Sequence, residues 1–98
     1  MEWQTKEIDL GNLEPNKEYT FSFLYMGSAN ILTVKPACGC TAAKVEENVI
    51  DGVYSSGKFP DFAKSQGFKD LQIQKSIDVI TDDGKKHKLI IKGHLYES

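Results

Sequence analysis

The chain has 98 residues, of which 40% are apolar, and its formal net charge is -2. This length supports one hydrophobic core, so we expect a single domain over residues 1–98. All twelve basic residues are lysine. Because arginine provides the bidentate contacts that suit phosphates and guanine edges, this composition argues against nucleic-acid recognition.

The N-terminus carries no sign of an export or membrane segment. Residues 1–7 lack the basic start and the apolar stretch of a secretory signal. No run approaches the ~18 apolar residues that a membrane-spanning helix needs. We therefore expect a protein that is made in the cytoplasm and has no membrane span.

The first part of the chain predicts strands. Residues 5–10 alternate, with Ile8 and Leu10 on one face, and Gly11-Asn12 supplies turn chemistry at their end. Residues 18–25 show the clearest strand pattern, because four aromatic side chains fall on one face: Tyr19, Phe21, Phe23 and Tyr25. In a chain without arginine, this stripe indicates a sandwich core rather than a surface that stacks bases.

A third strand, over residues 31–35, runs into the stretch that holds both cysteines, Cys38-Gly39-Cys40-Thr41. Pro36 lacks a backbone N–H and Gly39 can adopt positive φ, so the strand must end in a tight corner. In an extended segment, cysteines two residues apart hold their Cβ atoms farther apart than the ~3.5–4.5 Å of a disulfide. We expect two reduced, structural thiols; a redox-active or bridged pair and a metal site are the alternatives.

After the corner, the pattern predicts short strands. Residues 43–46 and 49–50 are β-prone, and we interpret them as edge strands whose charged neighbours discourage edge-to-edge association. Asp51-Gly52 is typical of a turn, and residues 53–54 would begin a further short strand.

The segment over residues 55–70 is the least regular, and a short helical turn is predicted around residues 61–65. It contains three phenylalanines: Phe59, Phe62 and Phe68. The regular strands already supply the large apolar groups that a small core can hold, so we expect these three to be in excess and to form the main partner-contacting surface. The alternative is that the segment folds back and caps one end of the sandwich with its own phenylalanines.

The last third predicts a long hairpin. Residues 71–79 keep one apolar parity, residues 82–84 form the turn, and Leu89 and Ile91 alternate with polar residues in the return strand. We expect this hairpin at the centre of the fold, facing the aromatic stripe of residues 18–25. About seven short antiparallel strands with turns between them predict an immunoglobulin-like β-sandwich, with a small open barrel as the alternative.

The tetrapeptide Cys38-Gly39-Cys40-Thr41 resembles, in its strand context, the signature of a bacterial and bacteriophage family of unknown function. The context is an F-x-F strand and N-I-L-x-V before it, and K-S-I-x-V-x-T-D-D-G and L-I-I-K-G-H-L after it. Members of that family carry CGCT on an immunoglobulin-like sandwich related to Hydin-type domains, and the similarity covers about residues 8–96. The chain departs from the family pattern at residues 48–52, where a Pro-Gly turn usually stands.

The sequence lacks the common catalytic motifs: a nucleophile elbow, a phosphate-binding glycine loop and a zinc-binding helix. The candidate nucleophile and base pairs are a cysteine with His87 or His94, whose spacings also differ from those of common zinc sites. We expect His87 to be solvated beside the hairpin tip and His94 to lie on the surface. We therefore predict no enzyme and no catalytic, cofactor-binding or metal-binding residues.

Charged residues gather around the hairpin turn. Asp82 and Asp83 are better explained as turn formers than as calcium ligands, since no extended ligand loop surrounds them. A group of lysines follows, which is either a solvated face or a surface that attracts an acidic partner: Lys85, Lys86, Lys88 and Lys92.

Two functional classes remain. The resemblance implies a structural or interaction module, and because the family contains phage proteins, we expect an auxiliary protein that decorates or cements a tailed-phage virion, with the major capsid protein as candidate partner. The missing secretory signal favours this class over envelope members of the family. The alternative is a thiol-dependent redox or soft-metal-binding protein of a bacterial envelope, acting through the Cys38 and Cys40 pair.

Overall fold

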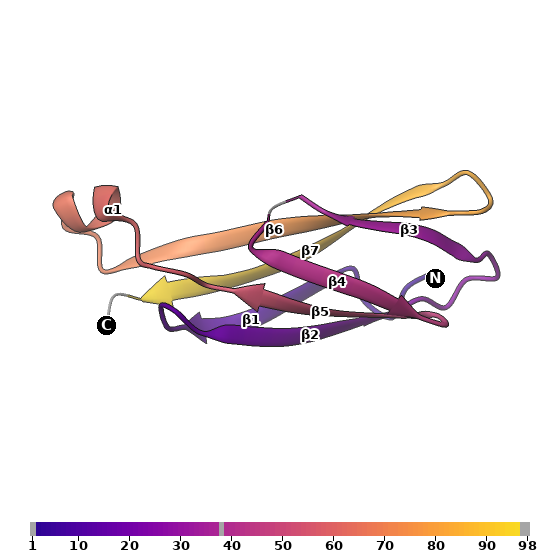
Figure 1. The fold of residues 1–98 in the computed structure, drawn as a ribbon, viewed down its shortest axis with the longest axis horizontal. Coiled ribbons are helices and arrows are strands. Elements are labelled where there is room, and N and C mark those ends of the chain that lie inside the picture. The colour runs from indigo at the N-terminus through magenta and orange to yellow at the C-terminus, as the bar shows by residue number, and fades with distance from the viewer. Residues whose placement is uncertain (1, 38, 97–98) are drawn as a thin grey trace.

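The computed structural model describes residues 2–37 and 39–96, which form two packed β-sheets and one short helix (Figure 1). One sheet has the strand order β1-β7-β6-β3 and the other β2-β5-β4. The strands are β1 (Glu7–Leu13), β2 (Glu18–Leu24), β3 (Ile31–Pro36), β4 (Thr41–Glu46), β5 (Val49–Ser55), β6 (Asp70–Thr81) and β7 (Lys86–Tyr96). The predicted all-β sandwich of seven strands is confirmed, and it is elongated, with extents of 48 × 19 × 18 Å.

The β6–β7 hairpin forms the centre of the four-stranded sheet, as the sequence predicts. Its turn closes where Gly84, at φ 84°, donates its N–H to the Thr81 carbonyl at 3.0 Å. One expectation for this sheet is wrong, because β1 pairs with β7 in parallel rather than antiparallel. An alternating pattern is the same in both directions, so the sequence of a strand does not set the direction of its partner.

Strand β1 continues through Gly11-Asn12, where the sequence predicts a turn. Gly11 adopts φ 77°, and its N–H donates to the Asp9 carboxylate at 2.8 Å. The register with β7 shifts between Asp9 and Asn12, so the turn residues form a β-bulge instead of ending the strand. The extra length brings Leu13 into the core.

The three-stranded sheet confirms the aromatic stripe and corrects the region after the corner. Phe21 and Phe23 are buried on β2, while Asp51-Gly52 lies in the middle of β5 rather than in a turn. The turn falls at Glu47-Asn48, and Glu47 has φ 55°. As a result β5 pairs with both β2 and β4 and is the central strand of this sheet. The expected edge strand at residues 43–46 is confirmed as β4, whereas residues 49–50 belong to the central strand.

The core lies between the two sheets and includes the predicted opposition of Phe23 to Leu89 and Ile91, all of them buried. Three further aromatic groups complete it from outside the regular strands: Trp3 near the N-terminus, Tyr25 just after β2, and Phe59 before the helix. Phe59 is therefore part of the core rather than in excess of it.

Candidate functional site

The segment between β5 and β6 is the most prominent feature of the surface. Figure 1 shows its helix, α1 (Asp61–Ser65), standing off the end of the sandwich where β7 finishes. The helix has the bounds that the sequence predicts. We call residues 56–69 the α1 lobe.

The base of the α1 lobe is tied to the loop that joins β1 and β2. Ser56 is the centre of these contacts: its hydroxyl donates to the Glu14 carbonyl at 2.6 Å and accepts the Lys17 N–H at 3.0 Å. The Asn16 N–H donates to the Gly57 carbonyl at 2.6 Å. These bonds give the lobe a defined position on the sandwich.

The three phenylalanines of the α1 lobe have two different environments. Phe59 is 2% exposed and packs in the core, together with the fully buried Ala63 of the helix. Phe62 and Phe68, in contrast, are 60% and 48% exposed. The capping interpretation is therefore correct for Phe59, while Phe62 and Phe68 remain available for a partner.

Backbone bonds fix the exposed pair on the lobe. The N–H of Phe68 donates to the Ala63 carbonyl at 2.9 Å, and the N–H of Gly67, at φ 81°, donates to the Lys64 carbonyl at 3.1 Å. The positions of both exposed rings are thus set by the short helix, whose Ala63 packs in the core. Aromatic groups presented on a rigid element lose little conformational entropy when they bind.

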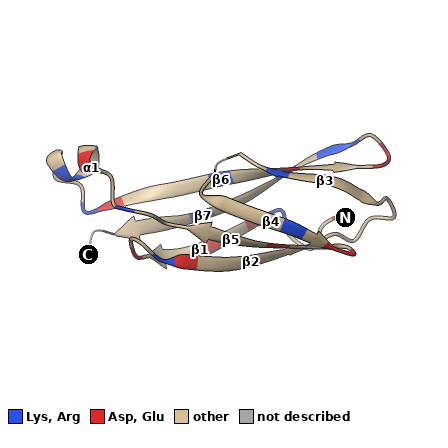
Figure 2. Ribbon diagram, viewed as in Figure 1, with Lys and Arg blue, Asp and Glu red and all other residues tan. Residues whose placement is uncertain are grey.

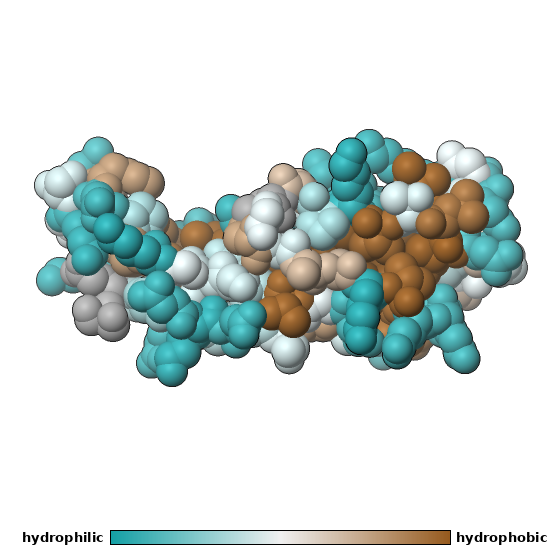
Figure 3. Space-filling model, in the orientation of Figure 1, coloured by the Kyte–Doolittle hydropathy of each residue, from teal (hydrophilic) through white to brown (hydrophobic). Residues whose placement is uncertain are grey.

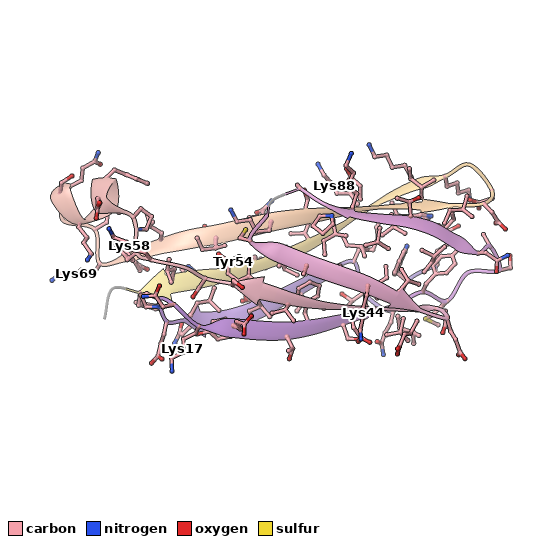
Figure 4. All side chains as sticks on the ribbon, in the orientation of Figure 1. Lys17, Lys44, Tyr54, Lys58, Lys69 and Lys88 are labelled. Carbon is pink, nitrogen blue, oxygen red and sulfur yellow. The ribbon has the colours of Figure 1, made fainter. Side chains whose placement is uncertain are left out.

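The α1 lobe also carries charged side chains. Figure 4 shows Lys58 and Lys69 on the lobe, and Figure 2 shows both acidic and basic positions there. The Lys58 ammonium lies 3.4 Å from the Asp61 carboxylate, at an exposed position where such a pair stabilises the fold little. An apolar centre with a mixed polar rim is the usual anatomy of a protein–protein interface.

The cysteine corner joins β3 of one sheet to β4 of the other. Cys40 is partly buried against the core and is disulfide-bonded, so the expectation of a reduced thiol at this position is wrong. Cys38 lies outside the described residues. Gly39 is exposed in the turn, and the buried Thr41 begins β4 opposite Tyr54.

The two histidines differ in environment. His94 is exposed, as expected, whereas His87 is buried, so the expectation that it is solvated is wrong. Its ring accepts a hydrogen bond from the Trp3 indole at 3.2 Å and lies within 3.3 Å of the Thr81 hydroxyl. His87 shares the strand parity of Leu89, and this signal in the sequence indicated burial. Trp3, by contrast, lies outside any pattern that predicts it.

The hairpin carboxylates act in turn formation, as expected. Asp82 accepts the backbone and side-chain N–H groups of Asn30, both at 3.0 Å. Asp83 accepts bonds from the Thr81 hydroxyl and the Lys85 N–H, and the Thr81 bond in particular holds the Asp83 pKa below its ordinary value. No group of three metal-binding side chains occurs within residues 2–37 and 39–96.

The lysines of the hairpin mostly have acidic neighbours. Lys86 lies 3.7 Å from Asp78, and Lys92 lies 2.8 Å from Glu7, whose hydrogen bond raises the Lys92 pKa. Lys88 points away from the sandwich in Figure 4. Carboxylates therefore offset part of the positive charge of this face, and it does not form one strongly basic patch.

Two further surfaces carry apolar groups. A groove of about 450 Å³ crosses the three-stranded sheet above Gly52, where Lys44 and Asp51 are cross-strand neighbours. Figure 3 shows apolar side chains gathered on the side where β3 and β4 diverge. Leu32 on β3 and Val45 on β4 are both exposed.

Comparison with known proteins shows the family of the chain and assigns no activity. No helix in the described part of the chain has the length and apolar character needed to cross a bilayer. No curated protein matches the chain. Residues 1–95 match the family model described as "Protein of unknown function (DUF1573)", and the chain therefore belongs to this family.

Proposed function

We propose that this protein is a non-enzymatic interaction module that docks on a protein partner through Phe62 and Phe68 of the α1 lobe. The observation that carries the proposal is the division of three neighbouring phenylalanines into one anchor and two exposed rings. An exposed phenylalanine contributes nothing to the core, yet a rigid aromatic group in a partner's pocket is a common source of binding energy.

The partner is a larger assembly. The resemblance of the CGCT stretch to a family with phage members supports an auxiliary role in a tailed-phage virion, where the domain would decorate or cement the capsid and contact the major capsid protein. The elongated shape also suits this role, because a lobe at one end leaves the long faces of the sandwich uncovered.

The test compares two double variants. Phe62→Ser with Phe68→Ser removes both exposed rings, and Phe62→Leu with Phe68→Leu is the matched control that keeps apolar side chains. Both should melt like the parent protein, because neither position contributes to the core. In particles purified from the source, mass spectrometry should find the parent and the leucine variant in stoichiometric amount and the serine variant depleted.

Two results would overturn parts of this proposal. Normal incorporation of the serine variant would move the contact away from the α1 lobe. Absence of the parent protein from purified particles would remove the virion role, and a pull-down with the parent and the serine variant would then test the lobe with other partners.

A thiol-dependent role in a bacterial envelope is the second candidate, and the disulfide-bonded state of Cys40 favours it. Replacing Cys38 and Cys40 with serine separates the two functions. If the interaction module is correct, this variant incorporates like the parent, because Cys40 lies between β3 and β4 and neither cysteine belongs to residues 56–69. A variant that folds but no longer supports redox exchange or metal binding, and that incorporates no differently from the parent, would favour the thiol-dependent role.

A further inference from the structure

Strand β4 is an open edge of its sheet, because in the described part of the chain it pairs only with β5. The Ser55 N–H donates to the Cys40 carbonyl at 2.8 Å, so these two residues form a hydrogen-bonded pair. Bonded and non-bonded pairs alternate along an antiparallel ladder, and the register of β4 with β5 does not shift. The backbone N–H and C=O groups of Ala43 and Val45 therefore point away from β5, where they can pair with a further strand.

The side chain near the end of this edge is apolar and uncovered. Val45 has the same strand parity as the buried Thr41 and the partly buried Ala43, which places it on the side of β4 that faces the other sheet. It is nevertheless 36% exposed, and Leu32 on β3 is 64% exposed. Figure 3 shows apolar side chains gathered where these two strands diverge. Apolar surface that gathers in one exposed place is a usual mark of a protein–protein contact.

The charges beside Val45 specify the partner. Lys44 and Glu46 both lie on the outer face of β4 and are exposed. The sign of the charge reverses about Val45, so a second copy that runs antiparallel, with its Val45 opposite Val45, sets each lysine opposite a glutamate. A two-fold interface requires this reciprocity, because every contact in it occurs twice. Opposite charges directly across two strands stabilise their pairing.

The neighbouring registers are unfavourable. The outward backbone groups belong to every second residue, so one copy can slide along the other only in steps of two residues. A step in one direction sets Lys44 opposite Lys44 of the second copy, and a step in the other sets Glu46 opposite Glu46. Like charges directly opposite each other destabilise a strand pair. Charged residues thus oppose association of this edge in the neighbouring registers and favour it in one.

We propose that the protein forms a two-fold dimer through β4, in which the three-stranded sheets of two copies join into one continuous sheet. The two Val45 residues meet on the axis and exchange two backbone hydrogen bonds. Two ion pairs flank this centre, each between Lys44 of one copy and Glu46 of the other. Figure 1 shows the α1 lobe at the other end of the sandwich from the β4–β5 turn, so the dimer leaves both lobes uncovered.

The first test measures association by sedimentation equilibrium, from about 10 µM to about 1 mM protein. The mass of the parent should rise from the monomer value of 11.0 kDa toward twice that value. Glu46→Lys sets lysine opposite lysine at two places and should weaken the dimer by roughly tenfold. Phe62→Ser with Phe68→Ser is the control, and it should dimerise like the parent because the α1 lobe takes no part.

A mixture of two variants tests the register itself. Lys44→Glu alone and Glu46→Lys alone each set like charges opposite each other, but a heterodimer of the two has opposite charges at both places. The equimolar mixture should therefore associate about as tightly as the parent, and neither variant alone should do so. A parent that stays monomeric at every concentration overturns the proposal, as does a mixture that associates no better than its components.

The second test needs no variant, in case Lys44→Glu, which also faces Asp51 on β5, does not fold. Amide hydrogen exchange of the parent is compared at the lowest and highest concentrations. The Val45 N–H points away from β5 and gains a partner in the dimer, so its protection should rise by roughly tenfold with concentration. The Val53 N–H, which lies within the β4–β5 ladder, should keep its protection. Equal protection of Val45 at both concentrations would exclude the dimer.

Discussion

The ring of Phe21 on β2 lies against the backbone of Gly52 on β5, in the space that a Cβ atom at position 52 would fill. The two residues are cross-strand partners, and the Ala42 carbonyl oxygen lies only 2.8 Å from the same space. Glycine is needed here because a backbone and an aromatic ring approach each other closely.

Gly52→Ala should therefore destabilise the protein by about 1–3 kcal/mol, the usual effect of overpacking a core. Thermal unfolding measures the change. Gly39→Ala is the matched control, because nothing lies near a Cβ at position 39, and it should stay within about 0.5 kcal/mol of the parent. A Gly52→Ala protein that melts like the parent would contradict the close packing of Phe21.

Phe23→Ala should cost about 3–5 kcal/mol, because Phe23 is fully buried between the two sheets. This is a large part of the roughly 5–15 kcal/mol by which a domain is usually stable. Denaturant unfolding gives the value. The exposed Phe62→Ala on the α1 lobe serves as control, with an expected change within about 0.5 kcal/mol.

Phe59→Ala should also destabilise the domain, although it lies in the irregular segment, because its ring belongs to the core cluster. We expect about 3–5 kcal/mol, together with faster proteolysis within residues 56–69 as the lobe loses its anchor. If only the partner contact weakened and the melt did not change, Phe59 would belong with Phe62 and Phe68.

Thr81→Val should raise the pKa of the Asp83 carboxyl toward its ordinary value of about 3.9, since the Thr81 hydrogen bond is the main cause of its depression. A carboxyl with a depressed pKa in the folded state stabilises the fold above its ordinary pKa, and this contribution is lost as the pH falls through the depressed value. Carboxyl carbon chemical shifts followed by NMR measure both proteins. An unchanged Asp83 titration would show that the hydrogen bond from the Lys85 backbone N–H is enough to keep the Asp83 pKa low.

Tyr54→Phe should make the protein more resistant to alkali. Burial raises the pKa of the Tyr54 phenol, so the folded state holds this proton more tightly than the unfolded state does. Stability is therefore lost as the pH rises above the ordinary tyrosine value of about 10. Unfolding followed by circular dichroism in alkaline buffer should show the gain, and Tyr96→Phe, at an exposed position, should show none.

The sequence predicts an element correctly where the pattern lies within that element's own residues. The aromatic stripe of β2, the β6–β7 hairpin and the bounds of α1 are local patterns, and the structure confirms them. The three phenylalanines in a segment broken by glycine and proline single out the α1 lobe in the sequence. Their division into Phe59 and the exposed pair could not be predicted, because it depends on which side of a five-residue helix meets the end of the sandwich.

Alternation of side chains and the chemistry of turns are properties of neighbouring residues, and they determined that this chain forms a β-sandwich with a central hairpin. Only the tertiary structure decided which residues from distant parts of the chain come into contact. The contact between Trp3 and His87 joins residues 84 positions apart. Gly52 lies in a central strand, and the ring of Phe21 on the neighbouring strand fills the space beside it. Local periodicity holds no information on such distant partners, since a pattern fixes the face on which a side chain lies but not the residue that it contacts.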